Sequence, residues 1–582
     1  MTTKINKKTG LLQCTALLAL LLSSCGEQMD YKEYNVYDKD YIEQNFTRIG
    51  GFMTNLYNTV DYDFGNFSSG AMLASASDES EYSQMGNAIE DFYNGAWSPS
   101  NAKENLPSAW TKMYQGIATA NAYLDEFQDA TFSELALNTD YNAQMHRYRN
   151  YQYEARFMRA YYYFNLVRAY GGVPLVDRVM TAEEINQLPR SSADDIFQFI
   201  ISECDAIKDL IVENYSDLGQ YALDAEETGR ADRLAVLALK ARAALYWASP
   251  LFNSTGDTER WHQAALYTKQ LIDAAEARGK GLSANYADLW SARAYNTASI
   301  AKEVIFGRRY NSTSSGDHVV EGYNYPVGIE GGTGGNCPTQ NLVDAYDMKN
   351  GKSIFEAGSG YDATNPYANR DPRLEATIAK NGDVWPTYQT AALQTYQGGV
   401  NGEPQTNATP TGYYLKKLCN GSISLASNST VQNATHMWLT FRMGEFYLNY
   451  AEAVFRYLGS ADATSSELPM SAREAASKTR LRAGVAEFAI GMDSATFWTR
   501  YQRERMVELA FEGHRFWDVR RWKEADKYLT AITEMKLTLN DDGIISYARN
   551  TVSRQWDDKM YLFPIPQTER MKNPNLAQNP GW

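Results

Sequence analysis

The sequence predicts a mostly α-helical protein, in which about eight paired helices form a helical-repeat scaffold and an irregular, loop-rich subdomain adds a few short strands. Two observations predict this fold class. Apolar residues recur at helical spacing through most of residues 41–284 and 436–582. Between residues 285 and 435 this periodicity fades, and Gly, Asn, Thr and Tyr dominate. A structureless loop of that length is uncommon, so we expect short strands there, such as Glu303–Gly307 and Tyr413–Leu418.

The segment from Glu154 to Val176, EARFMRAYYYFNLVRAYGGVPLV, predicts a helix that is buried on two sides. Two rows of apolar and aromatic side chains follow helical spacing along it. A helix with two apolar faces must lie between neighbours, as helices do in a stacked repeat array. Gly171 can adopt the left-handed conformation that closes the helix, and Pro174 prevents the helix from resuming.

The other helices are predicted by the same spacing. Ser191 or Ser192 is placed to cap the helix at Asp194–Leu210. Alanines every three or four positions in Asp232–Phe252 allow a neighbouring helix to approach closely. Such helix pairs resemble tetratricopeptide repeats, although the repeat period of about 34 residues is not kept. The predicted helices are Tyr41–Tyr57, Leu106–Phe127, His146–Tyr170, Asp194–Leu210, Asp232–Phe252, Trp261–Ala277, Trp438–Leu458, Ala472–Ala483 and Phe497–Trp522.

Three glutamates of the last predicted helix share one face, and four arginines in the same segment are available as their partners. A row of carboxylates can indicate acid/base catalysis. Buried charges normally need partners, however, so we expect an ion-paired structural helix. The glutamates are Glu504, Glu508 and Glu512, and the arginines are Arg505, Arg515, Arg520 and Arg521.

The N-terminus predicts export. Three lysines precede an apolar run at Leu17–Leu22, which is too short to span a bilayer. The run ends in Leu22-Ser23-Ser24-Cys25, which resembles a bacterial lipobox, so cleavage before Cys25 would leave a thiol for lipidation, for example with palmitate. An ordinary secretory signal with an incidental cysteine is the alternative. We expect residues 1–24 to be a lipoprotein signal peptide and residues 25–40 an acidic tether.

Composition limits the partners and cofactors. The formal charge of −15 makes nucleic acid and anionic membrane surfaces poor partners. The 41 Tyr and 12 Trp supply rings either for packing between helices or for stacking on ligands. Cys204, Cys337 and Cys419 are far apart and odd in number, so we expect no disulfide framework. We expect no metal and no other cofactor; Asp/Asn-rich loops would allow Ca²⁺, but EF-hand spacing is absent from the sequence.

Signatures of catalysis are sparse. The five His residues form no HExxH motif, and the sequence has no nucleophile elbow. A glycoside hydrolase needs two carboxylates at a fixed separation in a cleft. The 70 acidic residues leave such a pair open, without a local signature for one. We therefore expect a protein that is not an enzyme, with a secreted glycoside hydrolase as the less favoured alternative.

Seven sequence features, in their order along the chain, resemble the SusD/RagB family of outer-membrane nutrient-binding lipoproteins. Each is weak alone, and their order together is specific. They are the lipobox at Cys25, EARFMRAYYYFNLVRAYGGVPLV, GRADRLAVLALKARAALYWASPLF, ANRDPRL at Ala368–Leu374 followed by TGYYLKKL at Thr411–Leu418, FRMGEFYLNYAEA at Phe441–Ala453, ERMVELAFEGHRFWDVRRW, and the terminal FPIP with QNPGW.

The resemblance implies a tetratricopeptide-like scaffold that carries an irregular, loop-rich region. It also implies a lipid-anchored position on the outer membrane, facing the cell exterior. Members of the family cap a SusC-like TonB-dependent transporter, capture oligosaccharides or polysaccharide fragments, and deliver them to the barrel. Three alternatives stay open: a peptide-capturing, RagB-like lid of such a transporter, a scaffold that binds only protein, and the hydrolase named above.

The ligand site of the family lies in variable segments, so its residues are expected by position. The stretches without most family motifs are Asp61–Asn105 and roughly Tyr310–Tyr396. Aromatic planes can cover the apolar face of a sugar ring, while acidic and amide groups bind its hydroxyls. Packing is the alternative for each aromatic residue, and capping or loop bracing is the alternative for Asp78 and its neighbour Glu79. The candidates are Asp78, Tyr82, Trp97, Asn101, Tyr323, Tyr325, Trp385 and Tyr388, with Trp97 first.

Overall fold

The computed structural model describes residues 39–60, 62–65, 67–100, 105–215, 229–290, 297–309, 319–427 and 436–582. The predicted signal peptide, the lipid-anchor residue Cys25, most of the tether and the candidate Asn101 lie outside these ranges. Within them, no helix is long and apolar enough to cross a membrane.

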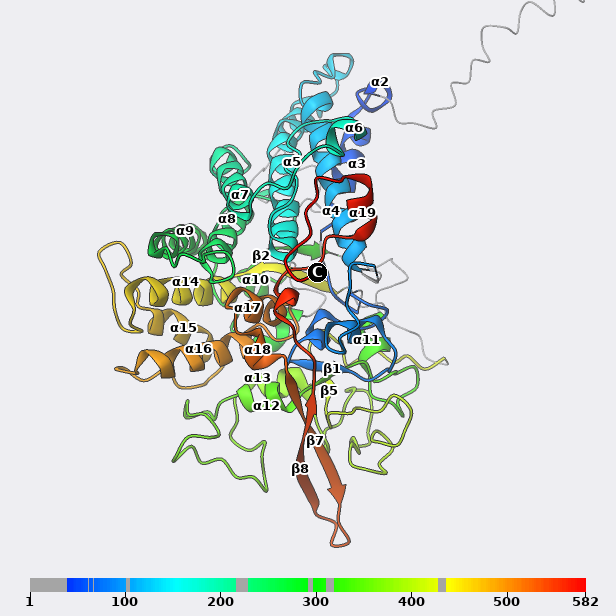
Figure 1. Cartoon of the computed structure of the whole chain (residues 1–582), viewed down its shortest axis with the longest axis vertical. Helices are drawn as coiled ribbons and strands as arrows, with labels where there is room; N and C mark the ends of the chain where they lie inside the picture. The colour runs from blue at the N-terminus through cyan, green and yellow to red at the C-terminus, as the bar shows by residue number, and fades with distance from the viewer. Residues whose placement is uncertain are drawn as a thin grey trace, which may run out of the picture.

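Long helices stacked side by side form the upper and left parts of the molecule in Figure 1. They are α3 (Phe46–Tyr57), α4 (Asn105–Ala122), α5 (Tyr141–Tyr170), α7 (Ala193–Ile207), α8 (Arg233–Ala248), α9 (Thr258–Glu276), α14 (Met443–Leu458), α15 (Ala472–Arg482), α16 (Ser494–Glu508) and α17 (His514–Arg521). α5 packs against α4 and α7, α7 against α8, α8 against α9, and α9 against α14. Each helix buries a face on the next, as in a helical-repeat array.

α5 is buried on two sides, as its sequence predicts. Apart from the half-buried Tyr153, the side chains of both predicted apolar rows are buried. Tyr162 lies so close to α4 that a Cβ atom at Gly116 would be 2.4 Å from its ring. Gly171 follows the last turn with φ +70° and donates its amide to the carbonyl of Val167, which closes the helix.

Three predicted helices differ in the structure. Tyr41–Tyr57 is split, because Asn45 caps a new helix by accepting from the amide of Arg48. Phe497–Trp522 is split into α16 and α17, because Phe511 and Gly513 adopt positive φ angles of 60° and 77°. Trp438–Leu458 begins as a strand, and its helix starts only at Met443. Continuous burial along that strand explains the error, because a fully buried apolar run fits a strand as well as a helix.

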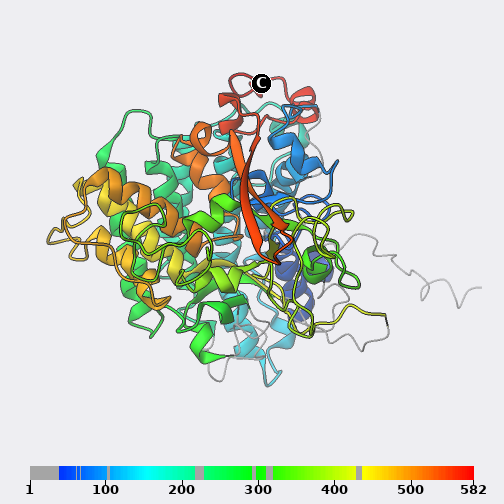
Figure 2. The same cartoon turned by 90° about the horizontal axis from the view of Figure 1, so that it is seen from below.

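The loop-rich region lies at the lower end of Figure 1. The described chain has short antiparallel strand pairs, most of them at this end, whereas β2 (Val304–Arg309) and its partner lie in the middle of the view. The strands are β1 (Ser80–Tyr82), β2 (Val304–Arg309), β3 (Asn336–Pro338), β4 (Ile378–Ala379), β5 (Tyr414–Leu415), β6 (Met437–Arg442), β7 (Ala531–Leu539) and β8 (Ile545–Ser553). β1 pairs with β3, β2 with β6, β4 with β5, and β7 with β8. β5 lies within the predicted strand region Tyr413–Leu418, and β2 overlaps Glu303–Gly307 but extends two residues beyond it. The β7–β8 hairpin, which was not predicted, projects from this end in Figure 1. In Figure 2, which shows the molecule from below, the hairpin lies in front of the other elements.

Short helices connect these parts of the described chain. They are α2 (Lys39–Ile42), α6 (Ala182–Ile185), α10 (Ala298–Ala301), α11 (Val319–Asn324), α12 (Gln340–Ala345), α13 (Arg373–Thr377), α18 (Ala525–Tyr528) and α19 (Gln567–Lys572). α12 packs against β7 and α16, so it links the hairpin to the helical scaffold.

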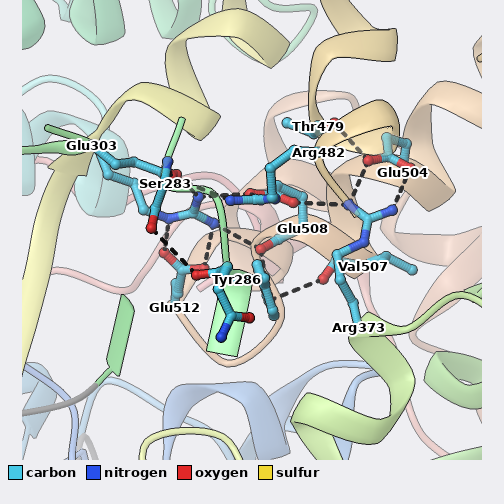
Figure 3. Close-up of polar contacts among 12 residues, drawn as sticks. Ser283, Tyr286, Glu303, Arg373, Thr479, Arg482, Glu504, Val507, Glu508 and Glu512 are labelled. Atoms are coloured by element: carbon cyan, nitrogen blue, oxygen red, sulfur yellow. Dashed lines mark hydrogen bonds and ion pairs between the residues drawn. The ribbon is translucent and has the colours of Figure 1, made fainter. Parts of the chain in front are cut away.

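A buried ion-pair network joins α16 to the loop-rich region (Figure 3). Glu508 binds Arg442 at 2.7 Å, Arg482 at 2.5 Å and Arg373 at 2.8 Å. Burial alone would raise the pKa of Glu508, but these three guanidinium groups hold it well below its ordinary value. The expected ion-paired helix is confirmed, whereas the expected partners are wrong. Arg505, for example, pairs with Asp518 instead.

Candidate functional site

The two stretches predicted to carry the ligand site, Asp61–Asn105 and Tyr310–Tyr396, meet where β1 pairs with β3. Tyr82 lies at the end of β1, and its hydroxyl donates to the carbonyl of Ser69 at 3.2 Å. Burial, with Tyr323 nearby, raises the pKa of Tyr82 to about 12. The structure therefore brings the two stretches together, although Tyr82 itself is buried.

Tyr323 packs on a loop that requires glycine. A Cβ atom at Gly65 would lie 2.7 Å from the Tyr323 ring, and one at Gly70 would lie 2.4 Å from the Tyr82 hydroxyl. Both glycines also have positive φ angles, of 92° and 99°. Tyr323 is half-buried whereas Tyr82 is buried, so solvent reaches only the Tyr323 ring of these two tyrosines.

Asp78 and Trp97 lie in the protein interior. Asp78 accepts from Arg515 Nε and Nη2 at 2.8 Å each, in a buried pair. The Trp97 ring is 5% exposed, and its centroid lies 5.0 Å from that of Phe563 and 4.9 Å from that of Trp582. Both side chains have the bracing and packing contacts that the sequence left as alternatives, and neither presents an open face to a ligand.

Tyr325, Trp385 and Tyr388 come together as one aromatic cluster. The Tyr325 centroid lies 6.1 Å from that of Trp385 and 6.4 Å from that of Tyr388. The buried Tyr325 hydroxyl donates to the carbonyls of Asn420 at 2.7 Å and Ile423 at 3.0 Å, which ties two loops together. Tyr325 and Trp385 are thus packing residues, and the half-buried Tyr388 is the cluster's contact with solvent.

Four aromatic residues that were not singled out from the sequence form a further surface cluster, here called the Phe355 platform. They are Phe355, Tyr361, Tyr367 and Tyr547. Phe355 is 64% exposed, and the three tyrosines are half-buried. The Tyr367 and Tyr547 centroids lie 6.1 Å apart, with their rings at 78°. Burial raises the pKa of Tyr547, and the nearby Tyr361 raises it further.

An ion pair borders the platform. Arg549 Nη1 and Nη2 donate to the two carboxylate oxygens of Asp344 at 2.6 and 2.8 Å. Gln340 also donates to Asp344, at 2.6 Å, so the carboxylate is held from two sides. The Arg549 guanidinium lies 5.9 Å from the Phe355 centroid. The bond with Asp344 and, to a lesser degree, Tyr361 raise the pKa of Arg549. A bidentate pair of this kind has a fixed orientation.

Regular elements position part of the platform. Tyr547 and Arg549 are two residues apart in β8 and therefore point to the same face of the hairpin. Asp344 lies in α12, whose first turn is capped by Thr339. Phe355, Tyr361 and Tyr367 recur every six residues in a Gly/Asp/Asn-rich stretch, and this spacing is the signal that could have identified them. No local spacing connects Tyr547 and Arg549 with these three residues, because the β7–β8 hairpin lies far from them in the sequence.

The described residues offer no grouping of three or more His, Cys, Asp and Glu side chains that could hold a metal ion. Cys204, Cys337 and Cys419 are free thiols. The chemistry available at the platform is therefore stacking, hydrogen bonding and charge.

Comparison with known proteins identifies the family. A family model described as SusD matches residues 302–582, and one described as starch-binding and associating with the outer membrane matches residues 29–245. The chain belongs to the SusD family. The second description refers to binding and association, and one related structure is described as a SusD-like carbohydrate-binding protein. Neither description names a reaction, in agreement with the expectation of a protein that is not an enzyme.

The relatives cover most of the chain. SusD-like protein P2 of Formosa agariphila is 24% identical over 491 residues, which are 81% of this chain and 80% of the relative. A solved SusD-like protein from Bacteroides fragilis has a TM-score of 0.73 at 23% identity, covering 93% of this chain and 98% of that one. A laminarin-binding SusD-like protein has a TM-score of 0.61 at 19% identity, covering 93% and 100%. These similarities confirm the predicted helical-repeat fold with short strands.

Proposed function

We propose that this SusD-family protein is a cell-surface glycan-binding lipoprotein that captures oligosaccharides and delivers them to a SusC-like TonB-dependent transporter. The observation that carries the proposal is the Phe355 platform, in which an exposed phenylalanine and three half-buried tyrosines lie beside a fixed Arg549–Asp344 pair. Two related structures, described as a SusD-like carbohydrate-binding protein and a laminarin-binding SusD-like protein, support the same class of ligand.

The platform suits the two surfaces of a sugar. Phe355 and the tyrosine rings cover the apolar C–H face of a pyranose, while Asp344 accepts from its hydroxyls and Arg549 donates to them. A stacked ring contributes on the order of 1 kcal/mol beyond the area that it buries. Because micromolar affinity requires about 8 kcal/mol, an oligosaccharide that spans several rings is a better ligand for this surface than a single sugar.

The N-terminal sequence supports the anchoring part of the proposal. Cys25 would carry the lipid, with palmitate among its acyl chains, and residues 25–40 would form a tether. The description of the matching family as associating with the outer membrane agrees with this location. An anchored protein of this kind can move as a lid over the transporter, open for capture and closed for transfer.

Affinity electrophoresis tests the glycan part. The mature chain from Gly26 onwards is run through gels that contain plant, microbial or host polysaccharides. We expect retardation by one class of glycan, a strong reduction of it by Phe355→Ala, and no effect of Met85→Ala, a control at an apolar side chain that is 95% exposed elsewhere. Unchanged retardation of Phe355→Ala would remove the platform from the proposal. Absence of retardation by every polysaccharide would favour a peptide cargo.

Co-purification tests the transporter part. The full-length protein is extracted from outer membranes of its source in mild detergent. We expect it to be isolated with a TonB-dependent barrel, and we expect Cys25→Ala to appear in the soluble fraction. Isolation of the lipidated protein without any barrel would contradict the proposed delivery.

A further inference from the structure

A cavity of about 430 Å³ lies away from the Phe355 platform, where α4, α5, α17 and β6 meet the segment 62–73. None of its lining residues belongs to the platform. Its size falls in the lower part of the range of small-molecule sites, roughly 300–1,000 Å³.

Two buried polar groups that line this cavity are unsatisfied. The side chains of Asn165, in α5, and Thr440, in β6, are each 7% exposed. Among the described residues, neither Asn165 Oδ1 nor Thr440 Oγ1 has a hydrogen-bond partner. The Asn165 amide nitrogen has only a long contact, at 3.7 Å, with the sulfur of Met113. Because buried polar groups in folded proteins are nearly always paired, two such groups at one cavity indicate a molecule that pairs with both.

Aromatic side chains form part of the remaining lining. Tyr161, Trp517 and Phe67 contribute ring surface, and the Arg168 guanidinium lies 4.6 Å from the Trp517 ring. A purely apolar ligand would leave Asn165 and Thr440 unpaired, and water alone would leave the ring surfaces uncovered. A ligand that fits both features has an apolar face and several hydroxyl groups.

The lining also contains charged groups, and several of them have partners in the protein. Asp63 accepts from the amide of Leu73 at 2.6 Å, and the Arg168 guanidinium lies against the Trp517 ring. Glu512 is bound by Arg442 and Lys417, and Arg242 is bound by Glu445. Burial and nearby arginines hold the pKa of His514 well below its ordinary value, so its ring is neutral at neutral pH and can also donate to or accept from a hydroxyl.

We propose that this cavity is a second carbohydrate site, which binds one pyranose ring. Asn165 Oδ1 accepts a hydrogen bond from one hydroxyl, Thr440 Oγ1 exchanges a hydrogen bond with another, and the aromatic walls cover the C–H faces. The inference takes its ligand class from the proposed function, but it concerns a separate site and a smaller ligand. The platform holds a length of glycan, whereas the cavity holds a single ring.

Isothermal titration calorimetry with monosaccharides tests this site. The mature chain is titrated with D-glucose, D-galactose, D-mannose, D-xylose and L-rhamnose. We expect one or more of them to bind the wild type. Asn165→Leu and Thr440→Val, which preserve side-chain shape and remove the polar atom, are expected to weaken that binding roughly tenfold each. Thr440→Ser keeps the hydroxyl and is expected to retain binding.

Thermal unfolding without sugar separates a binding role from a folding role. Removal of an unpaired buried polar group should leave the melting temperature of Asn165→Leu and Thr440→Val unchanged or raise it. A wild type that binds none of these sugars, or two variants that bind as the wild type does, would overturn the proposal.

Phe355→Ala keeps the two sites distinguishable. It is expected to lose retardation by polysaccharide and to bind monosaccharide as the wild type does. If Phe355→Ala loses polysaccharide binding and keeps monosaccharide binding, the platform and the cavity are separate sites. The converse result, in which Asn165→Leu loses monosaccharide binding but keeps polysaccharide retardation, supports the cavity independently. Loss of both by Phe355→Ala would contradict a separate site.

Discussion

At the scale of single residues, Glu508 is the meeting point of three guanidinium groups in the interior. Removal of one partner from such a group leaves buried charge without compensation. Glu508→Gln keeps the shape of the side chain and removes its charge. We expect the free energy of unfolding, measured by urea denaturation, to fall by about 3–5 kcal/mol.

A surface ion pair provides the control for that measurement. Lys269 and Asp273 lie four residues apart in α9, with 2.5 Å between their charged atoms. Exposed pairs of this kind contribute little, so Asp273→Asn should change the free energy of unfolding by less than about 0.5 kcal/mol. Equal effects of the two substitutions would mean that the buried network does not stabilise the fold.

Glu452 makes the fold sensitive to acid. Burial opposes its ionisation, but Arg521, bound through both carboxylate oxygens at 2.6 Å, helps to lower its pKa from 4.5 to about 2. A native pKa below that of the unfolded chain means that ionised Glu452 stabilises the protein above pH 4.5. This stabilisation is lost as the pH falls from 4.5 towards 2.

Thermal unfolding across that pH range checks the contribution of Glu452. The melting temperature of the wild type should fall more steeply with pH than that of Glu452→Gln, which has no proton to bind at this position. Parallel curves for the two proteins would show that Glu452 does not titrate in this range.

Single residues also show the limit of inference from sequence. Trp97 lies in a polar stretch, and nothing near it in the chain indicates that it is buried. One ring partner, Phe92, is close to it in the chain, but the other two, Phe563 and Trp582, come from the C-terminal end. A contact between residues so far apart in sequence follows only from the tertiary fold, so local composition could not separate a packing tryptophan from a ligand-binding one.

At the scale of elements, the loop before β1 depends on glycine. Gly70→Ala would place a Cβ atom 2.4 Å from the Tyr82 hydroxyl at a residue with φ +99°. Gly86→Ala has a comparable φ of +80°, but nothing lies within 4 Å of its Cβ position. We expect Gly86→Ala to cost about 1 kcal/mol of unfolding free energy through backbone strain, and Gly70→Ala about 1–3 kcal/mol more through overpacking.

Chemical denaturation of both variants measures that difference. Both variants lose unfolding free energy through backbone strain, so the difference between them is the cost of displacing the Tyr82 and Tyr323 rings. Equal stability of the two variants would mean that Tyr82 and Tyr323 move aside freely, and that the junction of the two loop stretches is not tightly packed.

The long helices could be predicted because their signals are local. Ser192 caps α7 with a complete capping box, and Gly171 ends α5. The β7–β8 hairpin was missed although Asp542-Gly543 is a turn signal and Gly543 has φ +80°. Its strands alternate only weakly between buried and exposed residues, because most of β8 is exposed. The break between α16 and α17 lies at Phe511 and Gly513, which adopt positive φ angles, and no proline in this segment signals it.

At the scale of the whole molecule, the helical scaffold and the loop-rich end have different roles. The helices bury a continuous core, while the loop-rich end carries the β7–β8 hairpin (Figure 1). Strand β8 of this hairpin contributes Tyr547 to the Phe355 platform. The sequence predicts residues 285–435 as the irregular region, whereas the β7–β8 hairpin at this end lies outside that range. The sequence could not identify the platform, because Tyr547 and Arg549, whose guanidinium lies 5.9 Å from the Phe355 ring, belong to a hairpin far from Phe355 in the chain.

The most direct test of the central claim is a crystal structure of the mature protein with an oligosaccharide from the polysaccharide that retards it. We expect sugar rings stacked on Phe355 and the platform tyrosines, with hydroxyls bonded to Asp344 and Arg549. Sugar bound elsewhere, with the platform open to solvent, would contradict the claim that this surface captures the glycan.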